Sequence, residues 1–174
     1  MGYGLIRCQN GAKPELLELG ALALQKYDEH FVRLKFIFEK VTGLIDTFNA
    51  TELAVESPFY GKNVQSMLKL GRAQGTAIAA ALSRSLEIYE YAPRKIKLAI
   101  TGQGNASKEQ VAALLQKMLA IPEMPANFDA TDALAVALCH FYQKTTASAT
   151  SQGNSAKSWK EFVNNNPKRV RLPK

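Results

Sequence analysis

The chain has 174 residues, of which 47% are hydrophobic, and its formal net charge is +7. This length is enough for one domain with a proper core, and the composition is that of a globular protein. No apolar run approaches the roughly 20 residues of a membrane-spanning helix, and no basic segment followed by an apolar block resembles a signal peptide. The composition therefore excludes an integral membrane protein. The two distant cysteines, Cys8 and Cys139, lack metal-ligand spacing and favour a reduced, cytoplasmic location.

The positive charge is concentrated after Thr145, where six Lys and Arg residues accompany a single acid, Glu161. This segment is also rich in Ser, Thr, Asn and Gly, a composition that is poor at forming a core. We therefore expect a folded domain over residues 1–144 and a basic, disordered tail over residues 145–174. Net charge alone is only a modest argument for binding nucleic acid.

The first predicted elements are two strands and a helix. Residues 2–8 form an apolar strand, and Asn10-Gly11 predicts a hairpin turn to a partner strand within residues 16–24. A helix follows over residues 27–48. Its expected buried face carries apolar residues at steps of three and four, namely Phe31, Leu34, Phe38, Val41 and Ile45.

Strands and helices alternate in the rest of the chain. The predicted elements are a buried strand over 52–56, a helix over 63–85, a strand over 86–91, and helices over 107–119 and 129–143. Pro93 stops the second of these strands, and a loop is expected around Gly102-Gln103-Gly104. Ser107 and Gln110 have the spacing of a capping box. This order predicts an α/β fold, with a mixed sheet flanked by helices.

Three acids stand where such a fold would bring them together. Glu56 ends a strand, and Asp129 and Asp132 open a helix on one face of it. Strand ends and helix starts meet at one edge of an α/β sheet, where clustered carboxylates repel each other unless a cation is present. Oxygen ligands of this kind suit Mg²⁺ or Mn²⁺, and two such ions can activate water and stabilise the leaving oxygen of a phosphodiester.

Simpler interpretations of these residues stay open at this point. Asp in the first turn of a helix commonly caps it, and Glu56 can be an ordinary acid at a strand end. His140 lies about two turns beyond Asp132 on the same predicted helix. We expect it to belong to the core or to support a ligand rather than to be one.

Three segments resemble the RuvC family of Holliday junction resolvases: LAVESPFYGKNVQSMLKLGRAQG, YAPRKIKLAITGQGNASKEQV and DATDALAVALCH. The resemblance extends over residues 2–143 and does not include the tail. It implies an RNase H-like fold, a homodimer, and symmetric nicking of a four-way DNA junction with divalent metal held by four acids. In this chain Glu56 matches the second acid, Asp129 the third and Asp132 the fourth.

The resemblance also implies roles in DNA binding. Phe59 matches an aromatic residue that stacks on a base near the crossover, and stacking of this kind tolerates any base. Lys97 and Lys108 match lysines near the scissile phosphate, and TGQGNASK is interpreted as a loop against the DNA backbone. The alternatives are core packing for Phe59 and a solvated surface for each lysine.

The helix over residues 63–85 is the expected dimer element. Gly71 and Gly75 lie one turn apart in an alanine-rich stretch, and small residues allow another helix to approach closely. A two-fold dimer matches a nearly two-fold junction, because each protomer then places one active site on one of two opposed strands. The alternative is packing against the sheet of the same chain, which part of this helix must do in any case.

The first acid of the family has no counterpart in this sequence. In the family it lies on a first central strand, roughly a dozen residues ahead of the strand that matches residues 2–8. We therefore expect a sheet that lacks this strand and leaves the strand over residues 2–8 unpaired on one side, as in an N-terminally truncated family member. Unpaired buried backbone groups cost about 1–3 kcal/mol each.

Three functions follow as hypotheses. The first is a metal-dependent endonuclease that nicks Holliday junctions symmetrically in DNA recombination and repair. It would use Mg²⁺ or Mn²⁺, with two ions per protomer when the first acid is present. The second is a junction-binding dimer whose cleavage is impaired, and the third is an RNase H-like nuclease acting on another branched or hybrid substrate. The resemblance implies a junction-binding protein and a branch-migrating helicase as partners, in the bacterial cytoplasm.

Overall fold

A computed structural model describes residues 1–9, 12–58, 63–125 and 127–152 of the chain. The chain opens with an antiparallel pair, β1 (Gly2–Arg7) and β2 (Glu15–Ala21), in which Gly2 faces Ala21 and the register shifts at Leu5/Ile6. The predicted hairpin pairing is confirmed. Its turn at Asn10-Gly11 lies outside the described residues.

A parallel pair forms the second sheet. β3 (Glu52–Glu56) and β4 (Glu87–Tyr91) are joined through the helix α2 (Val64–Leu82), since parallel strands need a crossover connection. Among the described residues, β1 pairs with β2 alone and β3 with β4 alone. The expected unpaired edge of β1 is therefore present. β3 is half-buried and Glu56 exposed, so the prediction of a buried strand is wrong, because this strand has a neighbour on one side only.

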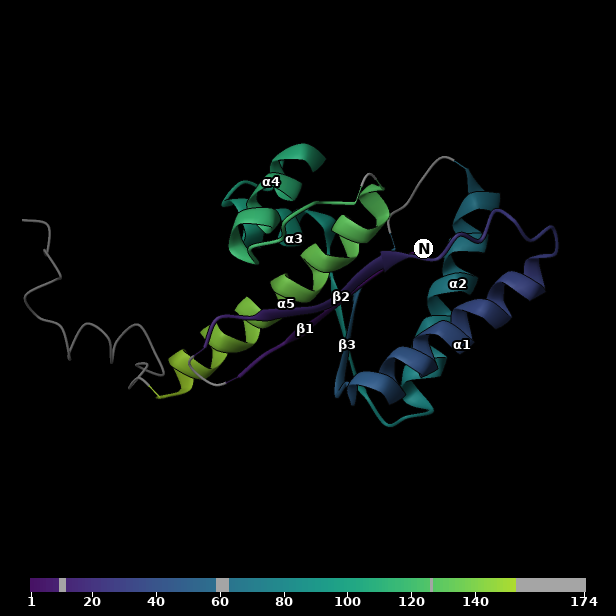
Figure 1. Cartoon of the computed structure of the whole chain (residues 1–174), viewed down its shortest axis with the longest axis horizontal. Helices are drawn as coiled ribbons and strands as arrows, with labels where there is room; N and C mark the ends of the chain where they lie inside the picture. The colour runs from purple at the N-terminus through teal and green to yellow at the C-terminus, as the bar shows by residue number, and fades with distance from the viewer. Residues whose placement is uncertain (10–11, 59–62, 126, 153–174) are drawn as a thin grey trace, which may run out of the picture. The chain divides into compact units, whose positions relative to one another are not determined.

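The helix α1 (His30–Phe48) lies alongside α2 (Figure 1). Ile37, Val41 and Ile45 of α1 form a core with Ala80 and Ala81 of α2 and with Leu86. The predicted buried face is correct for Val41 and Ile45. Leu34 is half-buried, and the prediction is wrong for Phe31 and Phe38, which are 76% and 38% exposed. Apolar spacing identified the stripe, but it does not say whether another element of the chain covers each position.

The helix α3 (Pro93–Thr101) was not predicted. Pro93 starts it at the first helical position, where its missing N–H is no loss, and Gly102 ends it with φ +74°. A proline and a glycine nine residues apart were a signal for a short helix rather than a loop. The following helix, α4 (Lys108–Met118), begins at the predicted capping box of Ser107 and Gln110, which is confirmed.

The last helix, α5 (Phe128–Gln152), is anchored by buried Leu134 and Leu138. It lies very close to β1: a Cβ atom on Gly2 would overlap the carbonyl of Asp129, and one on Gly4 would lie 2.9 Å from the Cα of Leu134. The two glycines thus let the helix that carries both aspartates rest directly on the strand.

The chain divides into two compact units, Met1–Phe141 and Tyr142–Lys174. α5 continues to Gln152, so the predicted end of this helix at residue 143 is wrong, while the predicted division into a domain over residues 1–144 and a tail over 145–174 stays a prediction. Residues 153–174 lie outside the described residues, and a basic tail there stays a prediction. No helix within the described part is both long and apolar enough to cross a membrane.

Candidate active site

Four of the predicted site residues line one cavity of about 370 Å³. Glu56 comes from the end of β3, Lys97 from α3, Lys108 from the start of α4 and Asp132 from the start of α5. Four apolar residues also line the cavity, namely Pro93, Ile96, Val111 and Ala135.

Local sequence features fix where each of these side chains stands. The capping box places Lys108 at the first residue of α4, and Pro93 sets the start of α3, so that Lys97 comes one turn later. The carboxylate of Asp132 projects from a helix whose orientation is set by buried leucines. The cavity thus lies where three helices and one strand end meet.

Opposite charges pair directly inside this cavity. Lys108 Nζ lies 2.6 Å from Asp132 Oδ2. This hydrogen bond raises the pKa of Lys108, and the negative charges of Asp132, Asp129 and Glu56 add to the rise against partial desolvation. Lys108 is therefore the cation that now balances the acids of the site.

The carboxyl group of Glu56 is under the opposite influence. Partial desolvation raises its pKa, and the neighbouring charge of Asp132 raises it further, while Lys108 and Lys97 act to lower it. Although Glu56 as a whole is an exposed residue, the protein surrounds its carboxyl enough to penalise the ionised form. Two carboxylates that disfavour each other's charge are the setting in which a cation binds well.

Asp129 does not line the cavity. Its Oδ2 lies 3.5 Å from the terminal ammonium of Met1, although its charge still acts on Lys108. In the part of the chain that the structure describes, no three or more His, Cys, Asp or Glu side chains are arranged to hold a metal ion. The structure thus brings two of the three predicted acids to one cavity, and a joint three-acid site stays a prediction.

The aspartates of α5 are not used as its cap. The side chain of Asn127 accepts the hydrogen bond from the backbone N–H of Asp129, at 2.8 Å. Asp129 and Asp132 instead face the charged groups of Met1 and Lys108. The simpler interpretation of the two acids as capping residues is therefore disfavoured.

The donor set fits a hard divalent cation at this cavity. Glu56 and Asp132 supply carboxylate oxygens, the ligands that Mg²⁺ and Mn²⁺ prefer. A cation held there would offset both the desolvation and the charge of Asp132 that raise the pKa of Glu56, and it would compete with Lys108 for Asp132. Both effects agree with a metal site.

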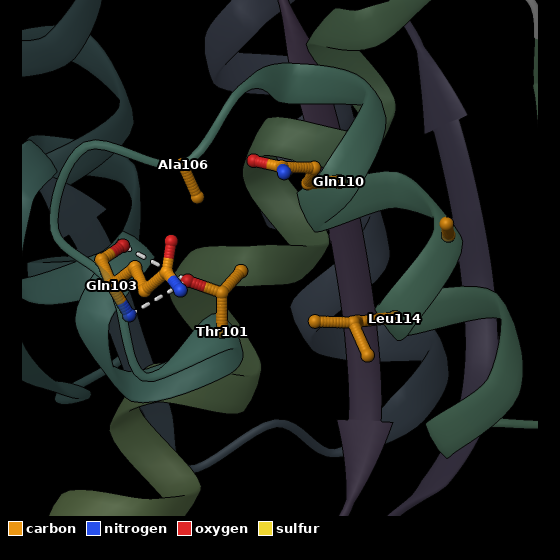
Figure 2. Close-up of a pocket in the computed structure, with 6 residues that line it drawn as sticks. Thr101, Gln103, Ala106, Gln110 and Leu114 are labelled. Carbon is orange, nitrogen blue, oxygen red and sulfur yellow. Dashed lines mark hydrogen bonds between the residues drawn. The ribbon is translucent and has the colours of Figure 1, made fainter.

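A second hollow of about 280 Å³ lies beside the loop between α3 and α4 (Figure 2). Thr101 shapes this loop, because its hydroxyl donates to the carbonyl of Gln103 at 2.9 Å and accepts from the Gln103 N–H at 3.0 Å. No motif in the sequence indicated this hollow. The predicted contact of this loop with a DNA backbone stays a prediction, and Phe59 lies outside the described residues.

The two glycines of the predicted dimer element lie on an open surface. Nothing lies within 4 Å of a Cβ atom built on Gly71 or on Gly75. The same face of α2 exposes Val64, Leu68 and Leu82. Packing against the chain's own sheet, the alternative for this helix, applies to Ala80 and Ala81 and not to the glycines.

Strand pairs flanked by helices, with carboxylates and lysines gathered where strand ends and helix starts meet, agree with the RNase H-like nuclease fold of the solved structures that this chain resembles. A sequence model described as crossover junction endodeoxyribonuclease RuvC matches residues 1–140. The chain therefore belongs to the RuvC family of crossover junction endodeoxyribonucleases, which are metal-dependent.

Individual relatives agree with this assignment. Over 173 residues the chain is 57% identical to the crossover junction endodeoxyribonuclease RuvC of Porphyromonas gingivalis, covering 98% of this chain and 91% of the relative. The corresponding protein of Bacteroides fragilis is 53% identical over 173 residues, with 98% and 90% covered. A solved structure of Thermus thermophilus RuvC in complex with a Holliday junction substrate is 29% identical, with a TM-score of 0.72, covering 83% of this chain and 88% of that one.

Proposed function

We propose that this protein is a metal-dependent endonuclease that nicks Holliday junctions symmetrically in DNA recombination and repair. The observation that carries the proposal is the shared cavity of Glu56, Asp132, Lys97 and Lys108 in a chain of the RuvC family. Cleavage of a phosphodiester needs carboxylates that bind a metal cation and lysines that attract the phosphate, and this cavity contains both. Membership of this family gives no support to the alternative of an impaired junction binder.

Each residue has a distinct task in the proposed reaction. Glu56, Asp129 and Asp132 would hold Mg²⁺ or Mn²⁺, and two ions per protomer is the expected occupancy when the first acid of the family is present. The bound metal supplies Lewis-acid activation of water and of the leaving oxygen. Lys97 and Lys108 attract the scissile phosphate to the cavity, and Lys108 releases Asp132 as metal and DNA arrive.

Contacts at the edge of the cavity and beyond it hold the DNA. Lys108 is the first residue of α4, where backbone N–H groups also favour a phosphate. Phe59 stacks on a base near the crossover and so holds the junction open beside the scissile phosphate. These contacts accept any DNA sequence, so they position the junction without selecting the bases at the cleavage site.

A homodimer is formed through α2. Its residues of low bulk or apolar character recur at steps of three and four on an exposed face, namely Val64, Leu68, Gly71, Gly75, Ala79 and Leu82. A stripe of this kind is costly in water, and a second copy of the same helix covers it with matched shape. The dimer then presents two cavities to two opposed strands.

The protein works in the cytoplasm with a junction-binding protein and a branch-migrating helicase. This part of the proposal rests on family membership, because a resolvase needs junctions that have been bound and moved to a cleavable position. The described residues offer no feature that selects one helicase.

The deciding experiment is incubation of the chain with a synthetic four-way junction and Mg²⁺. We expect paired nicks in two opposed strands, and no cleavage of a linear duplex of the same sequence. Binding without nicking would favour the impaired binder. Cleavage of an RNA–DNA hybrid but not of the junction would favour another RNase H-like activity.

A further inference from the structure

One buried polar side chain lies on α5 away from the cavity. His140 is 8% exposed and stands eight residues after Asp132, about 12 Å along the helix axis at 1.5 Å per residue. Its Nδ1 lies 2.7 Å from the hydroxyl of Tyr91, and its Nε2 lies 2.8 Å from Oε2 of Glu52. The imidazole therefore joins α5 to β4 and to β3 at once.

Both partners of His140 belong to the strand pair that carries Glu56. Side chains two and four residues apart point to the same face of a strand, so Glu52 and Glu56 share one face of β3. In the parallel register Glu56 pairs with Tyr91. His140 thus bonds Glu52, which lies four residues before Glu56 on β3, and Tyr91, which pairs with Glu56 from β4.

The hydrogen bonds fix the ring in one orientation. Ionised Glu52 can only accept, so Nε2 donates its proton to Glu52, while Nδ1 shares a hydrogen bond with the Tyr91 hydroxyl. The ring of Tyr89 stacks at a tilt, with centroids 4.3 Å apart. Both ring nitrogens therefore have partners, which a buried polar group requires.

Packing and directed hydrogen bonds together set the position of α5. Leu134 and Leu138 of this helix are fully buried. A shift of one residue would move the helix about 1.5 Å and rotate it about 100°. Either movement would break both hydrogen bonds of His140, so the histidine reinforces the register that the leucines set.

We infer that His140 is a positioning residue: by bonding Tyr91 and Glu52 it sets the separation between Glu56 on β3 and Asp132 on α5. The inference rests on the proposed function for its consequence, because that separation decides whether the two carboxylates can share a cation. It assigns a role in catalysis to a group that touches neither metal nor DNA.

The test compares His140→Phe and Tyr91→Phe with wild type and with Val136→Ala. Phe keeps an aromatic ring, somewhat larger than the imidazole, and removes its hydrogen bonds, while Tyr91→Phe deletes one oxygen atom and is the safer variant for folding. Val136 is buried on the same helix and outside the hydrogen-bonded chain, so Val136→Ala controls for lost stability. Junction nicking, Mn²⁺ affinity by calorimetry, and melting temperature are measured for each.

We expect His140→Phe to lower kcat for junction nicking about 10- to 100-fold with KM for the junction unchanged, since displacements near 1 Å cost this much. Mn²⁺ affinity should fall as well. A variant that combines His140→Phe with Tyr91→Phe should have the same kcat and Mn²⁺ affinity as His140→Phe alone, because both changes break the same set of hydrogen bonds. His140→Gln, which can still bond one partner, should recover part of the loss.

A purely structural role would give a different pattern. If His140→Phe and Tyr91→Phe lowered the melting temperature like Val136→Ala but kept wild-type kcat and Mn²⁺ affinity, the inference would be overturned. A wild-type chain that does not nick junctions would instead refute the proposed function. The Mn²⁺ affinities of the variants would still decide the role of His140.

Discussion

The acidic cavity and the outer face of α2 contrast in what one chain provides for them. In the cavity Lys108 neutralises Asp132 at 2.6 Å, and the buried surface of α5 holds the acids in place. On α2, Gly71 and Gly75 face open space, and Leu68 is 52% exposed. In the cavity the chain balances its own charge, whereas on the outer face of α2 it leaves apolar area uncovered.

This difference separates chemistry from assembly. The cavity can be tested by variants that change charge and keep shape, because its groups act through electrostatics. The α2 face can be tested by variants that change its apolar character, because it acts through burial. If the contrast is real, variants of one surface leave the function of the other largely intact.

Asp132→Asn is the sharpest test of the cavity. It keeps the shape of the side chain and removes its charge, so we expect junction nicking to fall by more than ~100-fold, because even supporting groups of metal sites cost about 10- to 100-fold. Junction affinity in a gel-shift assay should change by less than about threefold. Asp46→Asn, at the pair that Asp46 forms with Arg84, is the matched control and should nick normally. Loss of junction binding in Asp132→Asn would mean that the acid is structural.

Leu68→Asp tests the α2 face. A charge placed on the apolar stripe must be desolvated in a dimer, so we expect the protein to sediment as a monomer at concentrations where wild type is dimeric. Leu98→Asp is a close control, because Leu98 on α3 is 54% exposed and lies off the stripe. A dimer that survived Leu68→Asp would break the comparison, since α2 would then be an ordinary exposed surface.

Sequence reasoning located the cavity better than it located the elements around it. Glu56, Lys97, Lys108 and Asp132 line one cavity and Asp129 does not, and the roles of all five stay predictions. The helix that carries Lys97 was missed, because Pro93 was interpreted as a stop rather than as a first helical residue. Residue identity carries chemical information even where the local backbone is predicted wrongly.

Other misses arise from contacts that no local pattern contains. The spacing of Phe31 indicates an apolar stripe on α1, but not whether this chain supplies a partner for it, and Phe31 is exposed. The partners of His140 come from two strands far away in the sequence, so its hydrogen bonds could not be predicted from the helix alone. The close approach of α5 to Gly2 and Gly4 is likewise a property of packing.

Lys108→Ala should have an intermediate effect and shows how the cavity balances its charge. We expect nicking to slow about 10-fold, with the plot of log affinity against log salt shallower by about 0.9 for one lost phosphate contact. Lys108 lowers the pKa of Glu56, so its removal raises that pKa further. Glu56 must be ionised to bind metal, and the acidic limb of the pH–rate profile should therefore move to higher pH.

The control for this prediction lies on the same helix. Lys117 is exposed near the other end of α4, so Lys117→Ala removes an equal charge without touching Glu56 or Asp132. It should leave the acidic limb where it is in wild type. An acidic limb that stayed in place in Lys108→Ala would show that Lys108 is a solvated surface lysine and no part of the cavity.

Ser107→Ala should have the smallest effect and tests how firmly the cavity is built. The Ser107 side chain accepts a hydrogen bond from the backbone N–H of Gln110 at the start of α4, and losing such a cap costs about 1 kcal/mol of unfolding free energy. Ser107→Asp keeps an acceptor and should be near wild type in urea unfolding. Lys108 directly follows the cap, so fraying of the first turn of α4 would loosen the bond between Lys108 and Asp132. Asn63→Ala, which removes the cap of α2, is the control. Nicking should fall slightly more in Ser107→Ala than in Asn63→Ala. Equal activities would mean that α4 is held by its buried Val111 and Leu115 rather than by its cap.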